Sequence, residues 1–533
     1  MSTISTTTVY QRVVSYPRLF GTAQRFERFV FGVFGLLLGL VTWRHEMFHD
    51  ELQAWLIARD SPTLSALFHN LRYEGHPALW HLLLYIPAHI SGNPVSMQVL
   101  NYLLALAQGW LILSARRIQW YLLTLAAFSF FVFYGYGAVA RNYMLAMLLL
   151  TAAARCFLSE RPRRWMGIVL LVLAIQAHFF AIPIAAVIFF WLYCFPDAES
   201  LARPARLLRS GQFWVALALL LASLIAAYFT VRPPADIFTP AYTSGKESLA
   251  GYFLICEGRA WQAFFPIPGS YIPRDLLEVL VPRHHPSAVA ALLSLAVFLF
   301  VAATLRTARA RYFFLCAAFL DLVAFAATVH FPPVRHYGLI FASLVIALFI
   351  DTLPDSNSGQ PGRSRSSWLP NQVRTLLLVC FLGIQTMAAL VSAGLDVLRP
   401  YSEAKATSQW LQRSGLANNP MVIRPDYAGV GLIGYLQRPS AYYTTCRCFE
   451  SFVVWNTQRD EEHVLDQEDL NRVRETSTLP TLVIMNAPLP DSTREGLRLH
   501  LIQSFDQRPI YPDERFFIYQ EGSGQEGETP SGN

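Results

Sequence analysis

The sequence predicts an all-α polytopic membrane protein of about eleven transmembrane helices, followed by a small α/β domain on the extracytoplasmic side. Three observations predict this fold class. Of the 533 residues, 54% are hydrophobic and only 15% are charged, which is more apolar surface than a soluble domain buries. Apolar runs recur along residues 29–398, and clusters of arginine separate alternate runs. Beyond this segment the composition becomes that of a soluble chain.

The first apolar run, Phe29–Trp43, follows the basic segment 1–28 and has no small-residue cleavage site after it. We therefore expect a retained span, with residues 1–28 as a cytoplasmic N-terminus. Ten further runs are predicted to cross the membrane: 97–115, 118–134, 142–158, 165–180, 181–195, 211–230, 287–305, 311–330, 337–353 and 375–396. With this order, the arginine clusters all lie on the cytoplasmic side: 116–117, 161–164, 203–209, 306–311 and 363–374.

Two long segments are then predicted to lie on the opposite, outer face. The outer loop 44–96 contains the apolar stretch 76–90, which we interpret as an amphipathic helix at the outer interface. Counting that stretch as a span would move every later arginine cluster outside. The second outer segment, 231–286, is rich in proline, glycine and aromatic residues. On the cytoplasmic side, residues 354–367 have the composition of a flexible linker.

Residues 399–520 are predicted to form the extracytoplasmic α/β domain. Strand-like stretches lie at 420–424, 481–485 and 515–519, and helical patterns at 402–413, 426–436 and 464–474. Gly429, Gly431 and Gly434 match the G-x-G-x-x-G pattern of dinucleotide sites, but little nucleotide is present outside the cytoplasm, so close helix packing is the favoured interpretation. The tail 521–533 has no hydrophobic residue and is predicted to be disordered.

The cysteines of the outer domain allow a disulfide, because this compartment is oxidising. Cys446 and Cys448 are candidates, but a bond between cysteines at that spacing is expected to be strained. Cys256, in the second outer segment, is the alternative partner.

Two chemical patterns overlap directly after the first predicted span. Residues 45–49 read H-E-M-F-H and match the H-E-x-x-H pattern, which on a helix places two imidazoles on one face for zinc and a glutamate beside them as base. The acidic pair Asp50 and Glu51 follows at once. The zinc metalloprotease interpretation is disfavoured, because the match straddles the end of a span, has only Glu74 nearby as a third ligand and lacks any extended metzincin pattern.

Four stretches carry a family resemblance: HDELQAWLIARD, LRYEGHPALWHLLLY, YGYGAVARNYMLAML and FPPVRHYGLIF. Together they resemble the C-type membrane glycosyltransferases, in particular the bacterial group similar to protein O-mannosyltransferases and lipid A aminoarabinose transferases. The resemblance covers residues 26–350. It includes the order of the elements, from the first span through the acidic pair and the long outer loop to the remaining spans.

The resemblance implies a helical fold whose outer face holds a cavity, in which a polyprenyl-phosphate-linked hexose or pentose meets its acceptor. In the family the acid after the first span is the catalytic base, which here is Asp50, with Glu51 as its neighbour. Several members carry a second acid in the next outer loop, where this chain has Arg141. A divalent metal held by two carboxylates is therefore not expected, and no cofactor or metal site is predicted.

The chemistry of the residues agrees with this assignment. Sugar transfer from a lipid phosphate needs a base for the acceptor and positive charge for the departing phosphate, and it needs no acid. Asp50 supplies the base, while Arg141 and Arg335 supply guanidinium groups that bind phosphate in a bidentate manner. A single base that attacks opposite the leaving group inverts the anomeric centre. The alternative for both arginines is an anchoring role at the membrane interface.

Further substrate-binding candidates flank these residues. Tyr143 and His336 follow the two arginines closely in the sequence. Glu74 and His76 either line the cavity or cap the interfacial helix that follows them. His178, between two predicted spans, is interpreted as structural.

A lipid-linked sugar transporter or flippase is the alternative function, since it also needs arginines and acids that face an interior cavity. Against it, the candidate residues cluster on one face of the membrane, whereas transport sites lie near the midplane and accompany inverted repeats. A non-catalytic scaffold leaves Asp50 without a role.

The expected partners are a polyprenyl-phosphate-sugar donor, a glycan, lipid or protein acceptor and membrane lipids. The formal charge of +6 lies in short arginine clusters, so no nucleic acid is expected. The absence of an N-x-S/T sequon suits a bacterial inner membrane.

Overall fold

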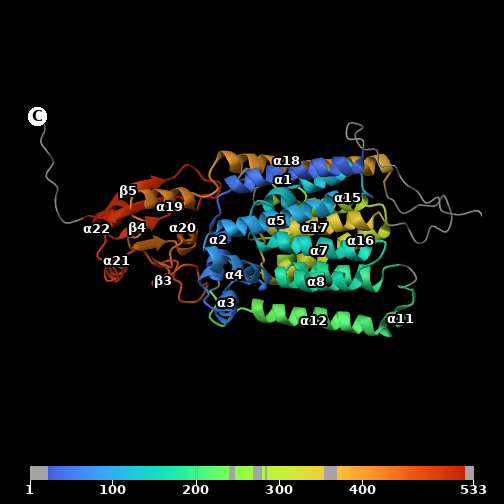
Figure 1. The fold of residues 1–533 in the computed structure, drawn as a ribbon, viewed down its shortest axis with the longest axis horizontal. Coiled ribbons are helices and arrows are strands. Elements are labelled where there is room, and N and C mark those ends of the chain that lie inside the picture. Colours follow the sequence, from blue (N-terminus) through green and yellow to red (C-terminus); the bar gives the residue numbers. More distant parts are fainter. Residues whose placement is uncertain are drawn as a thin grey trace, which may run out of the picture.

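The computed structural model describes residues 22–197, 200, 202–238, 247–267, 279–282, 285–352 and 369–522. A bundle of long helices carries a small sheet domain at one of its ends (Figure 1). The predicted linker 354–367 lies outside the described residues, as do most of the predicted segments 1–28 and 521–533 and parts of 231–286.

A helix is present at each of the eleven predicted spans. They are α1 (Ala23–Arg44), α5 (Val95–Leu113), α6 (Trp120–Ala127) with the π-helical turn η3 (Phe130–Gly135), α7 (Asn142–Leu158), α8 (Arg164–Ala177), α9 (Ala181–Ile188) with η4 (Phe189–Cys194), α12 (Gly211–Val231), α15 (Ala288–Ala303), α16 (Ala308–Thr328), α17 (Val334–Ile350) and α18 (Asn371–Leu398). Of the described helices, α1, α5, α12, α16 and α18 are long and apolar enough to cross a membrane, and five more apolar helices have 10–17 residues. The chain is thus a multi-pass membrane protein, while the number of eleven spans stays a prediction.

The apolar side chains of the helices either pack inside the bundle or are exposed on its outside. Helix α17 is buried from His336 to Ile350, as expected for a helix at the centre of a bundle. Helix α12, at the edge of the bundle in Figure 1, buries only Phe213, Ala216, Ser223 and Ala227 and exposes most of its large apolar side chains. A helix that is apolar all round and exposed is suited to a lipid environment.

The two predicted outer segments lie at the same end of the bundle. Both predicted outer segments lie beside the sheet domain: Tyr73 donates to Asp236 at 2.9 Å, and Ile237 pairs with Asn456 of the domain. At the far end, where α11 (Pro204–Leu208) lies in Figure 1, Asp351 accepts hydrogen bonds from the backbone N–H of Thr307 at 2.7 Å. Which end faces the cytoplasm stays a prediction.

Short helices fill the space between the bundle and the sheet domain (Figure 1): α2 (His49–Asp60), α3 (Leu64–Asn70), η2 (Leu71–Tyr73) and α4 (Leu79–Ser91). In α4, the predicted interfacial helix, Trp80, His81, Leu84 and Ala88 are buried while Ile86 and Ile90 are exposed. One side of α4 is thus buried in the protein, and the isoleucines exposed on it suit contact with lipid at the membrane interface. The described part of the second outer segment contains α13 (Leu249–Arg259) and η5 (Ala260–Ala263).

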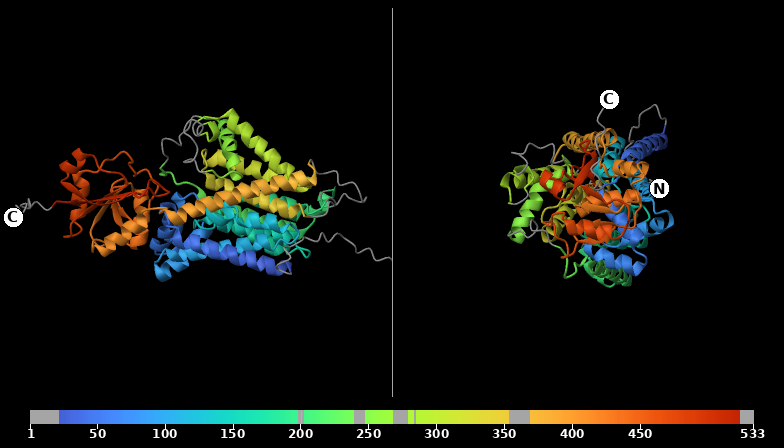
Figure 2. Two further views of the ribbon diagram at one scale, coloured as in Figure 1. Left: turned by 90° about the horizontal axis from the view of Figure 1, so that it is seen from above. Right: turned by 90° about the vertical axis from the view of Figure 1, so that its left-hand side faces the viewer.

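The C-terminal domain is a mixed six-stranded sheet with the order β3-β2-β1-β4-β6-β5, which the left view of Figure 2 shows beyond one end of the bundle. Its elements are α19 (Ala404–Arg413), β1 (Met421–Arg424), α20 (Asp426–Leu436), β2 (Ala441–Tyr443), β3 (Cys448–Glu450), α21 (Gln467–Arg474), β4 (Leu482–Met485), α22 (Asp491–Gly496), β5 (Leu499–Phe505) and β6 (Phe516–Glu521). Strand β1 pairs in parallel with β2 and β4, and the other pairs are antiparallel. The α/β domain and its predicted strands and helices are confirmed, while β2, β3, β5 and α22 were not predicted.

The three glycines of the G-x-G-x-x-G pattern lie inside α20, where the helix approaches its neighbours closely. The first, Gly429, is the fourth residue of the helix, whereas a dinucleotide site places its first glycine in the preceding turn. A Cβ at Gly429 would lie 2.7 Å from Ile423, and one at Gly434 would lie 2.9 Å from Leu52 of α2. The interpretation as close helix packing is confirmed.

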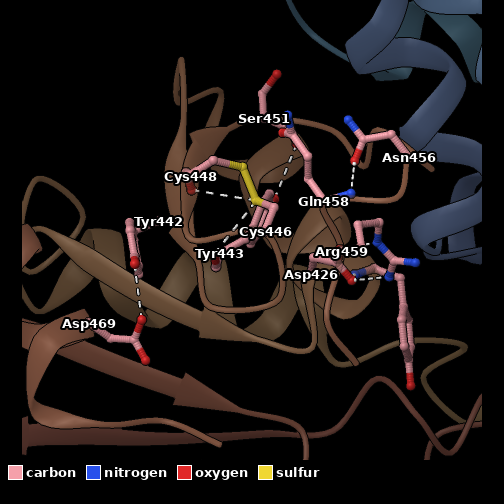
Figure 3. The surroundings of a disulfide bond; sticks show 11 residues. Asp426, Tyr442, Tyr443, Cys446, Cys448, Ser451, Asn456, Gln458, Arg459 and Asp469 are labelled. Carbon is pink, nitrogen blue, oxygen red and sulfur yellow. Dashed lines mark hydrogen bonds and ion pairs between the residues drawn. A yellow bond between two sulfur atoms is a disulfide. The ribbon is translucent and has the colours of Figure 1, made fainter. Parts of the chain in front are cut away.

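Cys446 and Cys448 form a disulfide in the turn between β2 and β3 (Figure 3). The expectation that this spacing disfavours the bond is wrong, and so is the alternative partner Cys256, which is buried in the bundle with a free thiol. The reason is the residue between them. Arg447 has a left-handed backbone with φ of 50°, which turns the chain and brings the two Cα atoms to 5.2 Å, within the range of ordinary disulfides.

A buried ion pair near this disulfide holds the loop that touches α2. Arg459 binds Asp426 through two hydrogen bonds of 2.8 and 2.9 Å (Figure 3). In the same loop Val453 exchanges two hydrogen bonds with the amide of Gln53, at 2.7 and 2.9 Å. Helix α2 is therefore bound directly to the C-terminal domain.

Replacement of Gly434 by valine tests this docking. The new side chain meets Leu52 across the α2–α20 contact, and overpacking of this kind costs about 1–3 kcal/mol, so we expect a lower midpoint of thermal unfolding in detergent. Gly496→Val is the matched control, because nothing lies within 4 Å of a Cβ at that position. Equal midpoints for the two variants would contradict the packing role of Gly434.

Candidate functional site

The acidic pair lies in the first turn of α2, which a connection of four residues separates from the end of α1. The helix begins after Phe48, which is extended, and the Glu51 carboxylate accepts the Phe48 backbone N–H at 3.2 Å. A carboxylate at the third helical position that binds back to the N-cap is half of a capping box, and negative charge in the first turn suits the helix dipole. The sequence F-H-D-E thus fixes where α2 begins and which way its first side chains point.

Glu51 points inward and is fully buried. One of its oxygens accepts the Ala140 backbone N–H at 2.6 Å, and the other contacts Nε2 of His45 at 2.9 Å. The other ring nitrogen of His45, Nδ1, lies 2.7 Å from the Asp396 carboxylate of α18. Burial lowers the pKa of His45, but the two carboxylates outweigh it and raise the pKa well above its usual value, so the ring is an imidazolium. The geometry of Glu51 is that of a positioning residue, because it fixes the residue before Arg141.

Asp50 points the other way and is bound by both predicted arginines. Its Oδ2 atom contacts Nη1 of Arg141 and lies 2.7 Å from Nη1 of Arg335. Its Oδ1 atom lies 3.5 Å from Nε2 of His49. Burial raises the pKa of the Asp50 carboxyl, but Arg141, Arg335 and His49 outweigh burial and hold the pKa well below its usual range. Two guanidinium groups and one carboxylate leave a net charge of one positive unit, which favours an anion at this place.

Aromatic residues pack beside the two arginines. Tyr143 stacks on Tyr136 with ring centroids 5.0 Å apart, and the guanidinium carbon of Arg141 lies 5.8 Å from the Tyr143 ring. Tyr143 also interacts electrostatically with the side chain of Arg335. His336 is buried with its ring 5.8 Å from that of Tyr143. The structure therefore brings Tyr143 and His336 together with both arginines, and their roles in substrate binding stay predictions.

Glu74 and His76 also reach this cluster. Glu74 accepts a hydrogen bond from Gln53 at 2.7 Å, and burial raises the pKa of its carboxyl to about 7. The ring of His76 lies 5.3 Å from that of His178, and burial, together with the charges nearby, holds its pKa well below the usual value. The alternative that these residues cap α4 is wrong, because the N-cap of that helix is Ala78, without a side-chain hydrogen bond. His178, interpreted as structural, contacts Tyr143 with centroids 4.4 Å apart.

The C-terminal domain contributes residues that the sequence did not indicate. Glu514, fully buried, accepts hydrogen bonds from both the backbone N–H and Nδ1 of His49, each at 2.6 Å. Tyr511 and Tyr427 lie against the same imidazole, with ring centroids 5.1 and 5.6 Å away. No local pattern connects His49 with a residue 465 positions later, so this contact was not predictable from the sequence.

The H-E-x-x-H residues do not form a zinc-binding helix. His45 caps the end of α1 and His49 begins α2, so the two imidazoles do not share the i, i+4 face of one helix. Both nitrogens of His45 are engaged by carboxylates. Within the described part of the chain, one group of ligand atoms is close enough to hold a metal ion, and it consists of His463, Asp466 and Asp469 in the C-terminal domain.

An open hollow of about 560 Å³ lies at the other end of the bundle, between α6 and the start of α18. Its lining contains one charged side chain, Arg374, which lies 3.5 Å from Asp351. This hollow has no acid and base that converge, so we place the functional site at the Asp50 cluster on chemical grounds.

The fold and this site define a class of architecture: a polytopic helical membrane protein in which an acid at the start of α2 meets a C-terminal α/β domain. The chain is similar in fold to ArnT from Cupriavidus metallidurans in the apo state, with a TM-score of 0.50, 12% sequence identity and coverage of 94% of this chain and 98% of that one. The fold expected from the family resemblance is thereby confirmed. A weaker likeness, to the arabinofuranosyltransferase AftD from Mycobacteria, has a TM-score of 0.35 and 15% identity over 95% of this chain and 42% of that chain, and it adds nothing to the assignment. No protein-family model and no curated protein sequence matches the chain.

The two histidines of the H-E-x-x-H pattern do not share one helix, and both are bound to carboxylates. We therefore expect the purified protein to contain no stoichiometric zinc and to keep its activity in the presence of chelators. Metal analysis by mass spectrometry measures this directly. One zinc per chain that disappears in His45→Ala or His49→Ala would contradict the expectation. Zinc that disappears only in His463→Ala would belong to the cluster in the C-terminal domain and would leave the assignment at Asp50 intact.

Proposed function

We propose that the protein is a membrane glycosyltransferase that moves a sugar from a polyprenyl-phosphate-linked donor to an acceptor at the outer face of the membrane, with inversion at the anomeric carbon. One observation carries this proposal: the carboxylate of Asp50, at the end of the bundle beside the C-terminal domain, lies between the guanidinium groups of Arg141 and Arg335. The site combines a proton acceptor with two groups that bind phosphate, which are the two requirements of the reaction.

The charge of the cluster suits the donor. A polyprenyl-phosphate sugar is a phosphodiester with one negative charge, and the cluster has one net positive charge before the donor binds. When the bond between the anomeric carbon and the phosphate oxygen breaks, its electrons stay on the phosphate, which gains negative charge. Arg141 and Arg335 therefore interact more strongly with the transition state than with the bound donor, as catalysis requires.

The same cluster explains how Asp50 becomes a base. Without donor, its carboxylate is bound to both arginines and its pKa lies well below the usual range, so it is a weak base. Donor phosphate competes for the two guanidinium groups and weakens their hold on the carboxylate. Asp50 then regains basicity only in the complex that needs it, and it accepts the proton of the acceptor hydroxyl on the side opposite the leaving phosphate.

Tyr143, His336, Glu74 and His76 are proposed to contact the donor, since the structure groups them around the arginines. The reaction needs no cofactor. The acceptor is a glycan, lipid or protein, and the proposed location is a bacterial inner membrane with the C-terminal domain on the periplasmic or extracellular side. A flippase is less favoured, because the cluster lies at one end of the bundle beside the C-terminal domain.

Transfer of radiolabelled sugar in liposomes tests the proposal, with polyprenyl phosphates that carry a hexose, a pentose or an aminopentose. We expect release of polyprenyl phosphate by the wild-type protein and a loss of rate on the order of a hundredfold to ten-thousandfold in Asp50→Asn. The amide removes the competitor for Arg141 and Arg335, so this variant should bind undecaprenyl phosphate as tightly as the wild type or more tightly. A protein that moves the lipid across the bilayer with the sugar still attached would be a flippase.

The arginine variants of the same assay separate binding from catalysis. Arg141→Ala loses a charge-assisted bidentate contact, so its affinity for undecaprenyl phosphate should fall on the order of ten- to a hundredfold, and Arg141→Lys should recover only part of it. Arg413→Ala, at an exposed position of α19, is the matched control and should bind normally. If Asp50→Asn transfers sugar at the wild-type rate, the assignment of the base is wrong.

The predicted sidedness is tested by single cysteines in a variant whose five free cysteines are replaced by serine. Cysteines at Ser65 and Ser492, both exposed near the outer end, should react in spheroplasts with a membrane-impermeant thiol reagent. A cysteine at Ser210, just before α12 at the far end, should react only after permeabilisation. The reverse pattern would place the C-terminal domain in the cytoplasm.

A further inference from the structure

His49 connects the acid of the site with a buried acid of the C-terminal domain. Its Nδ1 atom lies 2.6 Å from the Glu514 carboxylate, and its Nε2 atom lies 3.5 Å from Oδ1 of Asp50. Because Glu514 is an acceptor, the Nδ1 atom carries a proton and donates it, which leaves the lone pair of neutral His49 on Nε2, the nitrogen that faces Asp50. An imidazole oriented by a carboxylate on one nitrogen and directed at the reacting groups with the other is the arrangement of a general base.

We propose that His49 and Glu514 form a dyad that takes up the proton released during sugar transfer, so that the C-terminal domain positions the proton acceptor of the site. The inference rests on the proposed function and deepens it. His49 is the residue that holds the proton, and Glu514 is a positioning residue that orients the imidazole and stabilises its charged form.

The atoms and electrons of the step balance. The oxygen of the acceptor hydroxyl forms a bond to the anomeric carbon, and the bond from that carbon to the phosphate oxygen breaks, with its electrons on the departing phosphate. The hydroxyl proton passes to the Asp50 carboxylate and from there to Nε2 of His49, which becomes an imidazolium. Glu514 stays ionised throughout, and the imidazolium returns its proton to water after the products leave.

The surroundings of Asp50 explain why a second group is needed. Its carboxylate lies between two guanidinium groups, which favour the ionised form and make it a poor place for a proton to stay. His49 has an exposed side-chain fraction of 14%, so its proton has a path to solvent, whereas Glu514 is fully buried.

The groups that face His49 come from three parts of the chain: Asp50 beside it, Arg335 of α17, and Glu514, Tyr511 and Tyr427 of the C-terminal domain. Burial and Arg335 lower the pKa of the imidazole, but Glu514 and Asp50 outweigh them and raise it above 6.5. An imidazole with a raised pKa holds a proton more readily than the carboxylate next to it.

Glu514 itself is anchored so that it cannot turn away. Its second oxygen accepts the hydroxyl of Ser402, and its backbone carbonyl accepts the N–H of Glu403 at 3.1 Å. The same carboxylate oxygen that binds Nδ1 also accepts the backbone N–H of His49. The dyad is therefore fixed by the docking of the C-terminal domain on the first turn of α2.

The dependence of the transfer rate on pH, measured with saturating donor, tests the dyad. A phosphodiester donor does not titrate near neutral pH, so we expect the wild-type rate to rise with pH as His49 loses its proton, with a midpoint above 6.5. In Glu514→Gln, which keeps the hydrogen-bonding atoms but removes the charge, the imidazolium is less stable. The midpoint should therefore move to lower pH, and the maximal rate should fall on the order of ten- to a hundredfold.

His49→Gln should remove this acidic limb and lower the rate on the order of a hundredfold. Glu46 and Glu74, each with a pKa of about 7, also titrate in this range, and Glu46→Gln and Glu74→Gln should leave the midpoint of the limb where it is in the wild type. His500→Gln and Glu495→Gln, at exposed positions of the C-terminal domain, are the matched controls for the two dyad variants and should keep the wild-type profile.

Binding of undecaprenyl phosphate reports whether each variant retains a folded site. If His49→Gln does not bind it, Glu514→Gln alone decides, since glutamine preserves the local hydrogen bonds. A wild-type midpoint in Glu514→Gln, or a wild-type rate in a folded His49→Gln, would overturn the dyad while sugar transfer by the wild-type protein still supports the proposed function. Failure of the wild-type protein to transfer any of the sugars would overturn both.

Discussion

An imidazolium held between two buried carboxylates joins the elements on which the site depends. His45 contacts Asp396 at 2.7 Å and Glu51 at 2.9 Å, and none of the three side chains is exposed. Through this contact the ends of α1 and α18 meet the first turn of α2, and through Glu51 the Ala140 backbone is drawn to the same point. Breaking a buried ion pair by removing one partner costs about 3–5 kcal/mol, because the remaining charge is left uncompensated. The placement of Arg141 follows from this arrangement and not from contacts of its own side chain alone.

Adjacent residues of α2 serve opposite purposes because of helical geometry. Successive side chains of a helix point about 100° apart, so Glu51 enters the protein while Asp50 remains in the cluster beside the C-terminal domain. His49, one position earlier, points to the C-terminal domain. Three consecutive polar residues thus reach three different parts of the chain from one turn. The bundle positions Asp50 from one side and the C-terminal domain positions it from the other.

The parts of this fold that sequence predicted are those with a local physical cause. Apolar runs and alternate arginine clusters indicated the helices, and short apolar runs between helical patterns indicated β1, β4 and β6. Guanidinium chemistry singled out Arg141 and Arg335 as groups for the donor phosphate, and their contact with Asp50 was not predicted. What was missed depends on contacts between distant residues. The pairing of His49 with Glu514 spans 465 positions, and the disulfide depends on the left-handed backbone of Arg447, which no spacing rule gives.

The C-terminal domain has a structural reason to lie where it does. Gly434 lets α20 approach Leu52 closely, Val453 pairs with the amide of Gln53, and Glu514 binds the first residue of α2. These contacts all lie in the first half of α2, so they fix the domain relative to the part of the helix that carries the acidic pair. A displacement of the domain moves His49 and Gln53 together, and Gln53 is also the partner of Glu74. Glu74 lies beside Arg141 and Asp50. The geometry of the charged cluster therefore depends on how the C-terminal domain docks on α2.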